Sequence, residues 1–328
     1  MTRDGIAYLS VTARGRELSE RLRAALGGEA SCTPEASLSE WTADNFPVRR
    51  ALVYVGAVEI AVRAIAPHLR SKSTDPAIVA VDELGRFAVP LASGHLGGAN
   101  ELARQIASVT GGAAVITTAT DLNGVFAIDE WARRNDCAVI HPSGIKNVSA
   151  KLLAGGTVRI FTVFPVAGEP PEGVKLSDTA PDIWLDVRRH PSLSLTPRVL
   201  TLGVGCRRGI AQETLERRFS ALCEAYDLWP DAFADAATID IKAHEPGLIA
   251  FCAAHGWTLR TFGADELRRV PGTFTASAFV ERQTGVENVC ERAAVLCGQG
   301  ELLVRKYAGE GVTFAVARRP ARLDWNRR

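Results

Sequence analysis

Residues 87–100 read FAVPLASGHLGGAN, and this stretch gives the clearest indication of the fold class. The apolar run at 87–92 predicts a β-strand, and the run that begins at residue 99 has the spacing of an amphipathic helix. A glycine-rich turn between a strand and a helix is typical of α/β proteins. Short runs rich in valine, isoleucine and alanine alternate with amphipathic segments along the rest of the chain. We therefore expect an α/β fold whose N-terminal sheet is mainly parallel.

The sequence around this stretch predicts a compact first domain over residues 1–124. Residues 29–50 show no clear periodicity, and we expect them to be irregular. The expected elements are strands at 6–11, 51–55 and 113–118, helices at 16–26, 58–68 and 99–109, and a hairpin-like pair of strands at 77–81 and 86–91.

A small middle region and a separate C-terminal domain are expected after residue 124. Residues 125–197 have a weaker α/β pattern, and the segment 165–198 carries six prolines. Such a density disfavours helices and central strands and is typical of a connector, so the main boundary is placed there. The C-terminal α/β domain is expected over 198–320, with a helix at 286–297, and residues 321–328 form a tail.

The composition indicates an ordinary globular protein. Among 328 residues, 47% are hydrophobic, and 38 lysines and arginines nearly balance 37 aspartates and glutamates. Because neither charge is in excess, nucleic acids and membranes are not expected partners. The N-terminal apolar run is shorter than that of a signal peptide, and the seven cysteines include no C-x-x-C pair. We expect a cytoplasmic protein with reduced thiols, either a monomer or a homodimer.

The turn at 93–98 has the features of an anion site that contains an acid–base group. Glycines allow close approach of the backbone, and the N–H groups at the start of the next helix attract a carboxylate or phosphate. His95 is best suited to proton transfer, because its ordinary pKa lies near neutrality. The alternative is a purely structural turn that His95 caps. The candidate substrate-binding residues are Ser93, Gly94, Gly97, Gly98 and Asn100, and Glu101 is a candidate catalytic residue in the first helical turn.

The sequence VITTATD at 115–121 places polar residues where the next predicted strand ends. Thr117 and Thr118 are candidate substrate-binding residues at this position. Asp121 is a candidate catalytic residue that could orient His95 or position a water molecule. The alternative for Asp121 is an Asx turn or a helix N-cap.

A second glycine-rich turn, LGVGCRRG at 202–209, follows the first strand of the C-terminal domain. It matches the dinucleotide fingerprint poorly, because two arginines precede the last glycine. Guanidinium groups bind carboxylates well, so the turn is expected to hold a substrate anion. Cys206 could be a nucleophile, although no histidine lies near it in the sequence. The candidate substrate-binding residues are Gly205, Cys206, Arg207 and Arg208.

Three further polar residues are candidates for substrate binding, each with a simpler structural alternative. Lys242 can meet a substrate carboxylate or pair with Glu245. Ser277 follows a threonine-containing loop, and Glu287 lies four residues before Glu291, a spacing typical of a solvated helix face. The six histidines are far apart, so no metal site held by the protein is predicted. The G-x-S-x-G and H-E-x-x-H motifs do not occur, which disfavours common serine hydrolases and metalloproteases.

Taken together, these motifs resemble the cobalt-precorrin-5A hydrolase family of anaerobic cobalamin biosynthesis. The resemblance covers almost the whole chain, with the first two motifs in that family's N-terminal domain and the others in its C-terminal domain. The motifs are PLASGHLGGANELARQIA at 90–107, VITTATD at 115–121, LGVGCRRG at 202–209, IDIKAHEPGL at 239–248, GVENVCERAAVLCG at 285–298, LLVRK at 302–306 and GVTFAVA at 311–317.

The resemblance implies a hydrolase that acts on a small-molecule tetrapyrrole. It would open the ring A δ-lactone of cobalt-precorrin-5A and release the bridging two-carbon fragment as acetaldehyde, giving cobalt-precorrin-5B. Cobalt would arrive within the substrate, and no other cofactor is implied. We expect His95 to activate water, with Asp121 or Glu101 orienting its ring. The N–H groups of Gly97 and Gly98 would stabilise the oxyanion.

Arg207, Arg208 and Lys242 would anchor peripheral carboxylates of the macrocycle. A different class of function is a non-catalytic protein that binds or carries a corrinoid intermediate of the same pathway. Release of acetaldehyde distinguishes the two. A third alternative, an NAD-linked oxidoreductase, depends on the imperfect second glycine turn and requires NAD binding.

Overall fold

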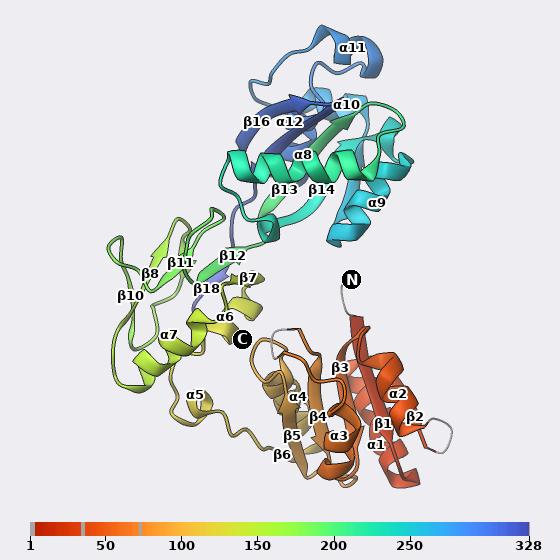
Figure 1. Ribbon diagram of the computed structural model, residues 1–328, viewed down its shortest axis with the longest axis vertical. Coiled ribbons are helices and arrows are strands. Elements are labelled where there is room, and N and C mark those ends of the chain that lie inside the picture. The colour runs from red at the N-terminus through yellow and green to blue at the C-terminus, as the bar shows by residue number, and fades with distance from the viewer. Residues whose placement is uncertain (1–3, 34–36, 72–73, 328) are drawn as a thin grey trace. The chain divides into compact units, whose positions relative to one another are not determined.

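The computed structural model describes residues 4–33, 37–71 and 74–327. The chain divides into two compact units. One unit holds the residues up to 133 together with 145–157, and the other holds 134–144 and the residues from 158 onwards. Figure 1 shows the sheet of the first unit in red and orange, and the C-terminal sheet of the second unit in green to blue. Helices combine with parallel-rich sheets in both units, so the α/β fold is confirmed.

The first unit is built on a six-stranded sheet with the order β2-β1-β3-β4-β5-β6. Neighbours from β2 to β4 are parallel, β4 and β5 form an antiparallel pair, and β6 is parallel to β5. The inner strands β3 and β4 contain continuous apolar runs because both of their faces are buried. The strands are β1 (Asp4–Ser10), β2 (Glu29–Cys32), β3 (Arg49–Val55), β4 (Ala77–Val81), β5 (Phe87–Ala92) and β6 (Ala113–Ala114).

Helices cover both faces of this sheet. Successive strand residues point to opposite faces, so Val53 packs with α1 and α4 whereas Leu52 packs with α2 and α3. Three further helices follow in the chain, with β7 between the last two. The helices are α1 (Ala13–Leu26), α2 (Leu38–Asn45), α3 (Val58–Ile65), α4 (Ala99–Thr110), α5 (Ala119–Leu122), α6 (Ile128–Arg134) and α7 (Gly144–Leu153).

Two predictions for this unit are wrong. Residues 29–50 hold β2 and α2 rather than irregular chain, apart from 34–36, which lie outside the described residues. A four-residue strand and an eight-residue helix capped by Ser37 are too short to show a periodicity in the sequence. The strand predicted at 113–118 covers only Ala113–Ala114, so the threonines at 117 and 118 lie beyond it.

The antiparallel direction of β5 changes the location of the first glycine-rich turn. Ligands of open parallel sheets bind at the edge where the strands have their carboxyl ends. Because β5 runs against β4, the turn at 93–98 lies at the edge opposite to the carboxyl ends of β1, β3 and β4. The expected position at the usual ligand edge is therefore wrong. Since β6 is parallel to β5, the segment after β6 does share an edge with the turn.

The second unit contains a five-stranded sheet with the order β10-β8-β11-β12-β7, antiparallel only between β12 and β7. The predicted proline-rich connector therefore contains strands, and β12 lies inside the sheet. Strands of three or four residues fit between the prolines, and Pro197 is the last residue of β12. The strands of this region are β7 (Cys137–Ile140), β8 (Val158–Thr162), β9 (Val166–Ala167), β10 (Val174–Leu176), β11 (Ile183–Leu185) and β12 (Ser194–Pro197).

The C-terminal sheet of the second unit has the order β15-β14-β13-β17-β16. Strands β13 to β15 are parallel, and β16 and β17 form an antiparallel hairpin beside β13. Helices α10 (Ala264–Arg269) and α12 (Cys290–Gly298) pack around Ile239 on one face, and Phe251 of α9 (Pro246–His255) stacks on Phe314 on the other. Figure 1 shows α8 in front of β13 and β14. The strands are β13 (Leu200–Cys206), β14 (Phe233–Ile239), β15 (Thr258–Phe262), β16 (Glu301–Gly309) and β17 (Val312–Arg318).

Helix α12 lies very close to β13 because of Gly203. A Cβ at this position would lie 1.8 Å from the carbonyl oxygen of Cys290, so only glycine fits. The helix predicted at 286–297 begins at Cys290 instead. The helices of this region are α8 (Gln212–Ala225), α9 (Pro246–His255), α10 (Ala264–Arg269), α11 (Ala278–Thr284) and α12 (Cys290–Gly298), with short 3-10 helices η1 (Pro230–Ala232) and η2 (Asp240–Lys242).

The predicted tail is part of the second unit. β18 (Leu323–Asp324) pairs with β9, and the side chain of Asn135 accepts a hydrogen bond from the N–H of Asp324 at 2.9 Å and donates to its carbonyl oxygen at 3.2 Å. Among the residues that the structure describes, every helix is too short or too polar to span a membrane.

Candidate acid–base cluster and substrate cavity

His95 lies between two carboxylates in the first unit. Its Nε2 is 2.8 Å from Oδ2 of Asp121, and its Nδ1 is 3.3 Å from Oδ1 of Asp129. All three side chains are largely buried, with 10% to 12% of their surface exposed. The turn after β5 carries His95, α5 carries Asp121 and α6 carries Asp129. We call His95, Asp121 and Asp129, together with Asn100 and Arg104, the His95 cluster.

The two carboxylates stabilise the charged imidazolium form of His95. The hydrogen bond with Asp129 is the largest cause; burial opposes it, and the hydrogen bond with Asp121 adds to it, so the pKa of His95 rises to about 9. Burial alone would raise the pKa of Asp121, but its contacts with His95 and Arg104 hold that pKa below its usual value. At neutral pH, His95 is therefore mainly protonated and donates both N–H groups to carboxylates.

Helix α4 contributes two further members of the cluster. Asn100 is 2% exposed, and its Nδ2 donates to Oδ2 of Asp121 and to Oγ1 of Thr118, both at 3.1 Å. Arg104 pairs with Oδ1 of Asp121 and lies 3.3 Å from Oε1 of Glu130. Thr118 therefore orients Asn100, which in turn holds Asp121, and substrate binding by Asn100 and Thr118 stays a prediction.

The glycine-rich turn uses most of its helix-start N–H groups internally. Gly98 donates to the carbonyl oxygen of His95, Ala99 to that of Ser93, and Asn100 to that of Gly94, at 2.9 to 3.1 Å. Of the two predicted oxyanion donors, Gly98 is thus already engaged. A Cβ at Gly97 would lie 2.3 Å from Cβ of Ser93, and one at Gly94 would lie 2.9 Å from Oδ1 of Asn100, so packing alone accounts for both glycines.

Two other predicted residues of this segment, Ser93 and Glu101, have contacts with groups other than His95. Ser93 is 5% exposed and its hydroxyl donates to the carbonyl oxygen of Asp75, so its contact with substrate stays a prediction. Glu101 lies 3.6 Å from Arg104, whereas Asp129 takes the second ring nitrogen of His95. Thr117 is exposed.

The charges around the first turn do not favour an anion. Four carboxylates and three cations lie here, so the predicted site for a substrate carboxylate has no excess of positive charge. These groups are Glu101, Asp121, Asp129, Glu130, His95, Arg104 and Arg133. The contacts of His95 with Asp121 and Asp129 still suit an acid–base role.

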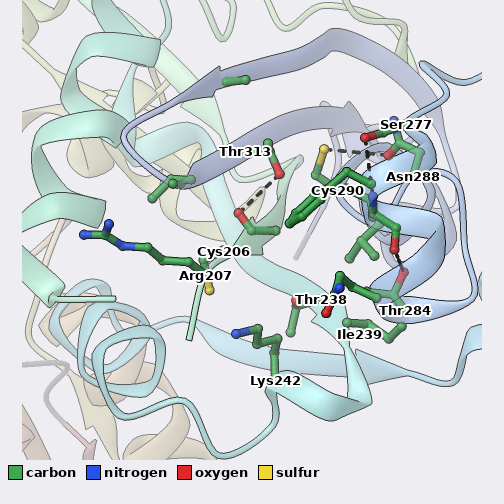
Figure 2. Close-up of a pocket in the computed structure, with 18 of the residues that line it drawn as sticks. Cys206, Arg207, Thr238, Ile239, Lys242, Ser277, Thr284, Asn288, Cys290 and Thr313 are labelled. Atoms are coloured by element: carbon green, nitrogen blue, oxygen red, sulfur yellow. Dashed lines mark hydrogen bonds between the residues drawn. The ribbon is translucent and has the colours of Figure 1, made fainter. Parts of the chain in front are cut away.

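A cavity of about 820 Å³ lies at the carboxyl ends of β13 and β14 in the second unit. Its volume is at the upper end of the range of small-molecule sites. Six of the predicted substrate-binding residues line this one cavity: Gly205, Cys206, Arg207, Arg208, Lys242 and Ser277. Figure 2 shows Arg207 and Lys242 on one side and Ser277 and Asn288 on another. We call this space the C-terminal cavity.

The lining of the C-terminal cavity is positively charged. Its ionisable cations are Arg207, Arg208, Lys242 and Lys306, and its carboxylates are Glu245 and Glu310. Lys242 pairs with Glu245 at 3.1 Å, and Glu310 pairs with Arg217, which lies outside the lining. None of the ion pairs among the described residues involves Arg207, Arg208 or Lys306. These three cations are therefore available to an anionic ligand.

Lys242 and Glu245 stabilise the second glycine-rich turn. Oε1 of Glu245 accepts the N–H of Gly209 at 2.6 Å, and its other oxygen accepts Nζ of Lys242. Burial would raise the pKa of Glu245, but Lys242 and the N–H of Gly209 hold it below its usual value. The structural alternative for Lys242, pairing with Glu245, is confirmed.

Burial keeps six of the seven cysteines in their thiol form. The pKa of Cys206 rises to about 11, mainly through burial and despite the nearby Lys242, which disfavours a nucleophilic thiolate. Burial likewise raises the pKa of five further cysteines to about 11 or 12: Cys137, Cys223, Cys252, Cys290 and Cys297.

A buried polar clamp fixes the loop that leads to α11. Glu291 is fully buried, and its carboxylate accepts the N–H and hydroxyl of Thr275 at 2.8 and 2.7 Å and the N–H of Lys306 at 2.8 Å. Asn288, 2% exposed, donates to the carbonyl oxygen of Thr275 at 2.9 Å and accepts the N–H of Glu291 at 2.8 Å. The solvated helix face expected for Glu291 is therefore wrong. Glu287 precedes the helix, pairs with Arg292 at 3.7 Å and lies outside the cavity lining, so its role in substrate binding stays a prediction.

Several residues of both sites were not predicted from the sequence. Asp129 is one acidic residue in a helix among many, and Lys306 lies within an ordinary strand. Ile241 and Phe279 line the cavity as exposed apolar side chains, which in a sequence resemble core positions. No group of three or more His, Cys, Asp or Glu side chains suited to a metal ion occurs within residues 4–33, 37–71 and 74–327.

Two family models match the chain. The model described as "Cobalamin synthesis G N-terminal" matches residues 40–121, and the model described as "Cobalamin synthesis G C-terminus" matches residues 200–317. The first range contains His95 and Asp121, and the second contains the second glycine-rich turn and the whole lining of the C-terminal cavity.

Relatives of similar length are cobalt-precorrin-5A hydrolases. One from Salmonella typhimurium is 31% identical over 95% of this chain and 97% of its own, and one from Priestia megaterium is 26% identical over 95% and 87%. The crystal structure of a cobalamin biosynthesis protein G homolog from Sulfolobus solfataricus is 22% identical, covers 96% of this chain and 97% of that chain, and has a TM-score of 0.41. With both family domains in order and 31% identity over nearly its full length, the chain belongs to the cobalt-precorrin-5A hydrolase family of cobalamin biosynthesis.

Proposed function

We propose that this chain is a cobalt-precorrin-5A hydrolase, which adds water to the ring A δ-lactone of cobalt-precorrin-5A and releases acetaldehyde to leave cobalt-precorrin-5B. The observation that carries the proposal is the near full-length match to the Salmonella typhimurium relative of that name. The C-terminal cavity supports it, because its unpaired cations suit a macrocycle with acetate and propionate arms. Cobalt is part of the proposed substrate, and no further cofactor is proposed.

In the proposed reaction, water attacks the lactone carbonyl and gives one proton to a base. The acyl–oxygen bond breaks, leaving a carboxylate on the ring A acetate and a hydroxyl on the bridging carbon. Loss of the hydroxyl proton lets this oxygen form a carbonyl bond while the carbon–carbon bond to the macrocycle breaks. Acetaldehyde departs, and the macrocycle keeps the electron pair and takes up a proton.

His95 is the proposed acid–base group for these proton transfers. Asp121 holds Nε2 at 2.8 Å, whereas the 3.3 Å contact between Nδ1 and Asp129 is the longer one and the easier one for water to replace. A neutral imidazole with its proton on Nε2 accepts a proton from water at Nδ1 and returns it to the departing oxygen. Since the pKa of His95 is about 9, the base role requires activity to increase with pH up to that value.

The C-terminal cavity is the proposed anchor for peripheral carboxylates. Arg207, Arg208 and Lys306 supply cations, and Lys242 acts through Glu245 to hold the second glycine-rich turn in shape. Removing an anchor should weaken binding and leave the chemical step largely unchanged.

The test is to incubate the purified chain with cobalt-precorrin-5A and to measure acetaldehyde with a coupled alcohol dehydrogenase. The expected result is one acetaldehyde per macrocycle, with ¹⁸O from labelled water in the new acetate carboxylate. Binding of the macrocycle without release of acetaldehyde would instead identify a carrier of the pathway intermediate.

A further inference from the structure

Two very exposed apolar side chains lie on the lining of the C-terminal cavity. Among the large hydrophobic residues that the structure describes, three have more than 60% of their surface exposed: Leu122, Phe279 and Ile241, at 71%, 67% and 63%. Phe279 and Ile241 both line the C-terminal cavity, and Leu122 follows Asp121 in the other unit. Single exposed apolar side chains are common on protein surfaces, but two of the three extreme cases at one cavity require an explanation.

Both side chains are held in place by well-anchored backbone. Phe279 lies in the first turn of α11, whose start follows the loop that Asn288 and Glu291 fix through Thr275. Ile241 lies in η2, where its N–H donates to Oδ1 of Asp240 at 2.7 Å. Hydrogen bonds of the fold thus position the backbone that carries these two exposed side chains.

The charges on the same lining restrict what can cover these side chains. Arg207, Arg208 and Lys306 are cations outside the ion pairs of the described residues, and they share the cavity with Phe279 and Ile241. A ligand that satisfies both features has an extended apolar face and carboxylates around its rim. A small polycarboxylate lacks the face, and a neutral apolar molecule lacks the carboxylates.

We infer that Phe279 and Ile241 contact the flat face of a tetrapyrrole macrocycle while the cations bind its peripheral carboxylates. The pair determines specificity for a macrocycle over smaller polycarboxylates. The inference rests on the proposed function for the class of substrate, and it assigns to these two residues a contact that is independent of the chemical step.

The experiment measures binding of uroporphyrin, a planar tetrapyrrole with eight carboxylates, to the full chain by absorbance and fluorescence. Phe279→Ala and Ile241→Ala should each weaken binding about tenfold, as expected when one large apolar contact is lost. Phe279→Trp keeps an aromatic face and should bind within threefold of the unchanged chain. Mellitate, a benzene ring with six carboxylates, should compete for the cavity with an affinity that Phe279→Ala changes less than twofold.

Ile249→Ala and Phe87→Ala are matched controls, because these side chains are 45% and 53% exposed and lie outside the cavity lining. Both should bind uroporphyrin within twofold of the unchanged chain. Failure of the unchanged chain to bind uroporphyrin, or equal affinity in Phe279→Ala and Ile241→Ala, would overturn the inference. A change of oligomeric state in Phe279→Ala without loss of uroporphyrin affinity would also overturn it, because a second copy of the chain, and not a macrocycle, would then cover this side chain.

The outcome is separable from that of the proposed function. Loss of uroporphyrin affinity in the two alanine variants, together with no acetaldehyde from cobalt-precorrin-5A, would reject the hydrolase and keep the macrocycle contact. Acetaldehyde release with unchanged uroporphyrin affinity in both variants would reject the contact and keep the hydrolase.

Discussion

His95 contacts a carboxylate at each ring nitrogen, and this arrangement restricts its chemistry. The imidazolium donates to Asp121 and Asp129, and the pKa of about 9 follows mainly from the Asp129 contact. To act as a base, His95 must first lose one of these two protons, whereas the imidazolium can act as an acid without a prior change. The pH dependence of the reaction therefore distinguishes the two duties.

We expect kcat/KM to increase with pH and to level off above about 9, because the proposed base is the neutral imidazole. Asp129→Asn removes the largest cause of the raised pKa of His95 and should move the inflection to lower pH. Asp121→Asn should move it less. The measurement is the initial rate of acetaldehyde release between pH 6 and 10.

The control for this profile is His95→Gln, which should lower kcat about 100-fold or more and leave no inflection near pH 9. A profile that decreases above pH 9 in the unchanged chain would show that the imidazolium is the active form. His95 would then serve as an acid, and another group would activate the water.

Arg207 and Arg208 should act on binding rather than on chemistry. Arg207→Gln and Arg208→Gln are each expected to raise KM about three- to tenfold and to change kcat less than twofold, because each removes one exposed charge contact with a substrate carboxylate. The effect should shrink at high salt. Arg282→Gln on α11 is a control, since this exposed cation lies outside the lining. An unchanged KM in both variants would remove the arginines from the anchor.

Sequence patterns predicted part of these sites for a definite physical reason. His95 and Asp121 each follow a strand, and the strands are parallel neighbours, so their meeting was predictable. Asp129 joins them through the path of the chain after α5, which has no local signature. Phe279 and Ile241 resemble core residues in sequence, and only the folded structure shows that their side chains are exposed.

At the scale of elements, the junction of β13 and α12 shapes the C-terminal cavity. Gly203 allows the helix to lie close to the strand, and Asn288 links the start of the helix to the loop before α11. The shape of the cavity wall therefore depends on these packing and hydrogen-bond contacts, and two variants test them.

Gly203→Ala should destabilise the second unit by about 3 kcal/mol or more, because its Cβ would lie 1.8 Å from a backbone carbonyl oxygen that cannot rotate away. Gly263→Ala is the matched control, since its Cβ would meet only side-chain oxygens, of Glu266 at 3.4 Å and of Asp240 at 3.7 Å. The measurement is urea unfolding followed by circular dichroism. Equal midpoints for the two variants would contradict the close approach.

Asn288→Ala should cost about 2 kcal/mol of stability, since it leaves the carbonyl oxygen of Thr275 without its donor and removes the cap on Glu291. Hydrogen exchange at residues 271–284 should accelerate in this variant, and KM should increase more than kcat falls. Asn326→Ala, at an exposed position, is the control. Unchanged exchange at 271–284 would show that Asn288 does not hold the loop.

Elements with long apolar runs were predicted well, and short ones were not. The runs at 51–55 and 77–81 form inner strands because burial on both faces requires continuous apolar sequence. The strands between the prolines at 165–198 span two to four residues, and their pairing partners range from the next strand of the chain to β18 near its end. Tertiary pairing, which no local pattern records, places β10, β11 and β12 in the five-stranded sheet and β9 beside β18.

At the scale of the whole molecule, the raised pKa of His95 should make the stability of the first unit depend on pH. The folded pKa of about 9 exceeds the usual 6.5, so the folded state holds an extra proton between these values. The stabilisation is complete below pH 6.5 and is lost as pH rises toward 9. The difference in urea midpoint between the unchanged chain and His95→Gln should therefore shrink from pH 6 to pH 9.5. A constant difference would contradict the raised pKa.

The protonated thiols have a practical consequence for chemical labelling. A cysteine placed by Phe279→Cys at the exposed rim of the C-terminal cavity would keep an ordinary pKa near 8.5. At pH 7 it would hold at least about a hundredfold more thiolate than a buried thiol with a pKa of 11 or above. A maleimide fluorophore should then react at that position faster than at the six native cysteines with a raised pKa, and the seventh, Cys32, is buried, so the labelled chain can serve as an optical sensor for whatever enters the cavity.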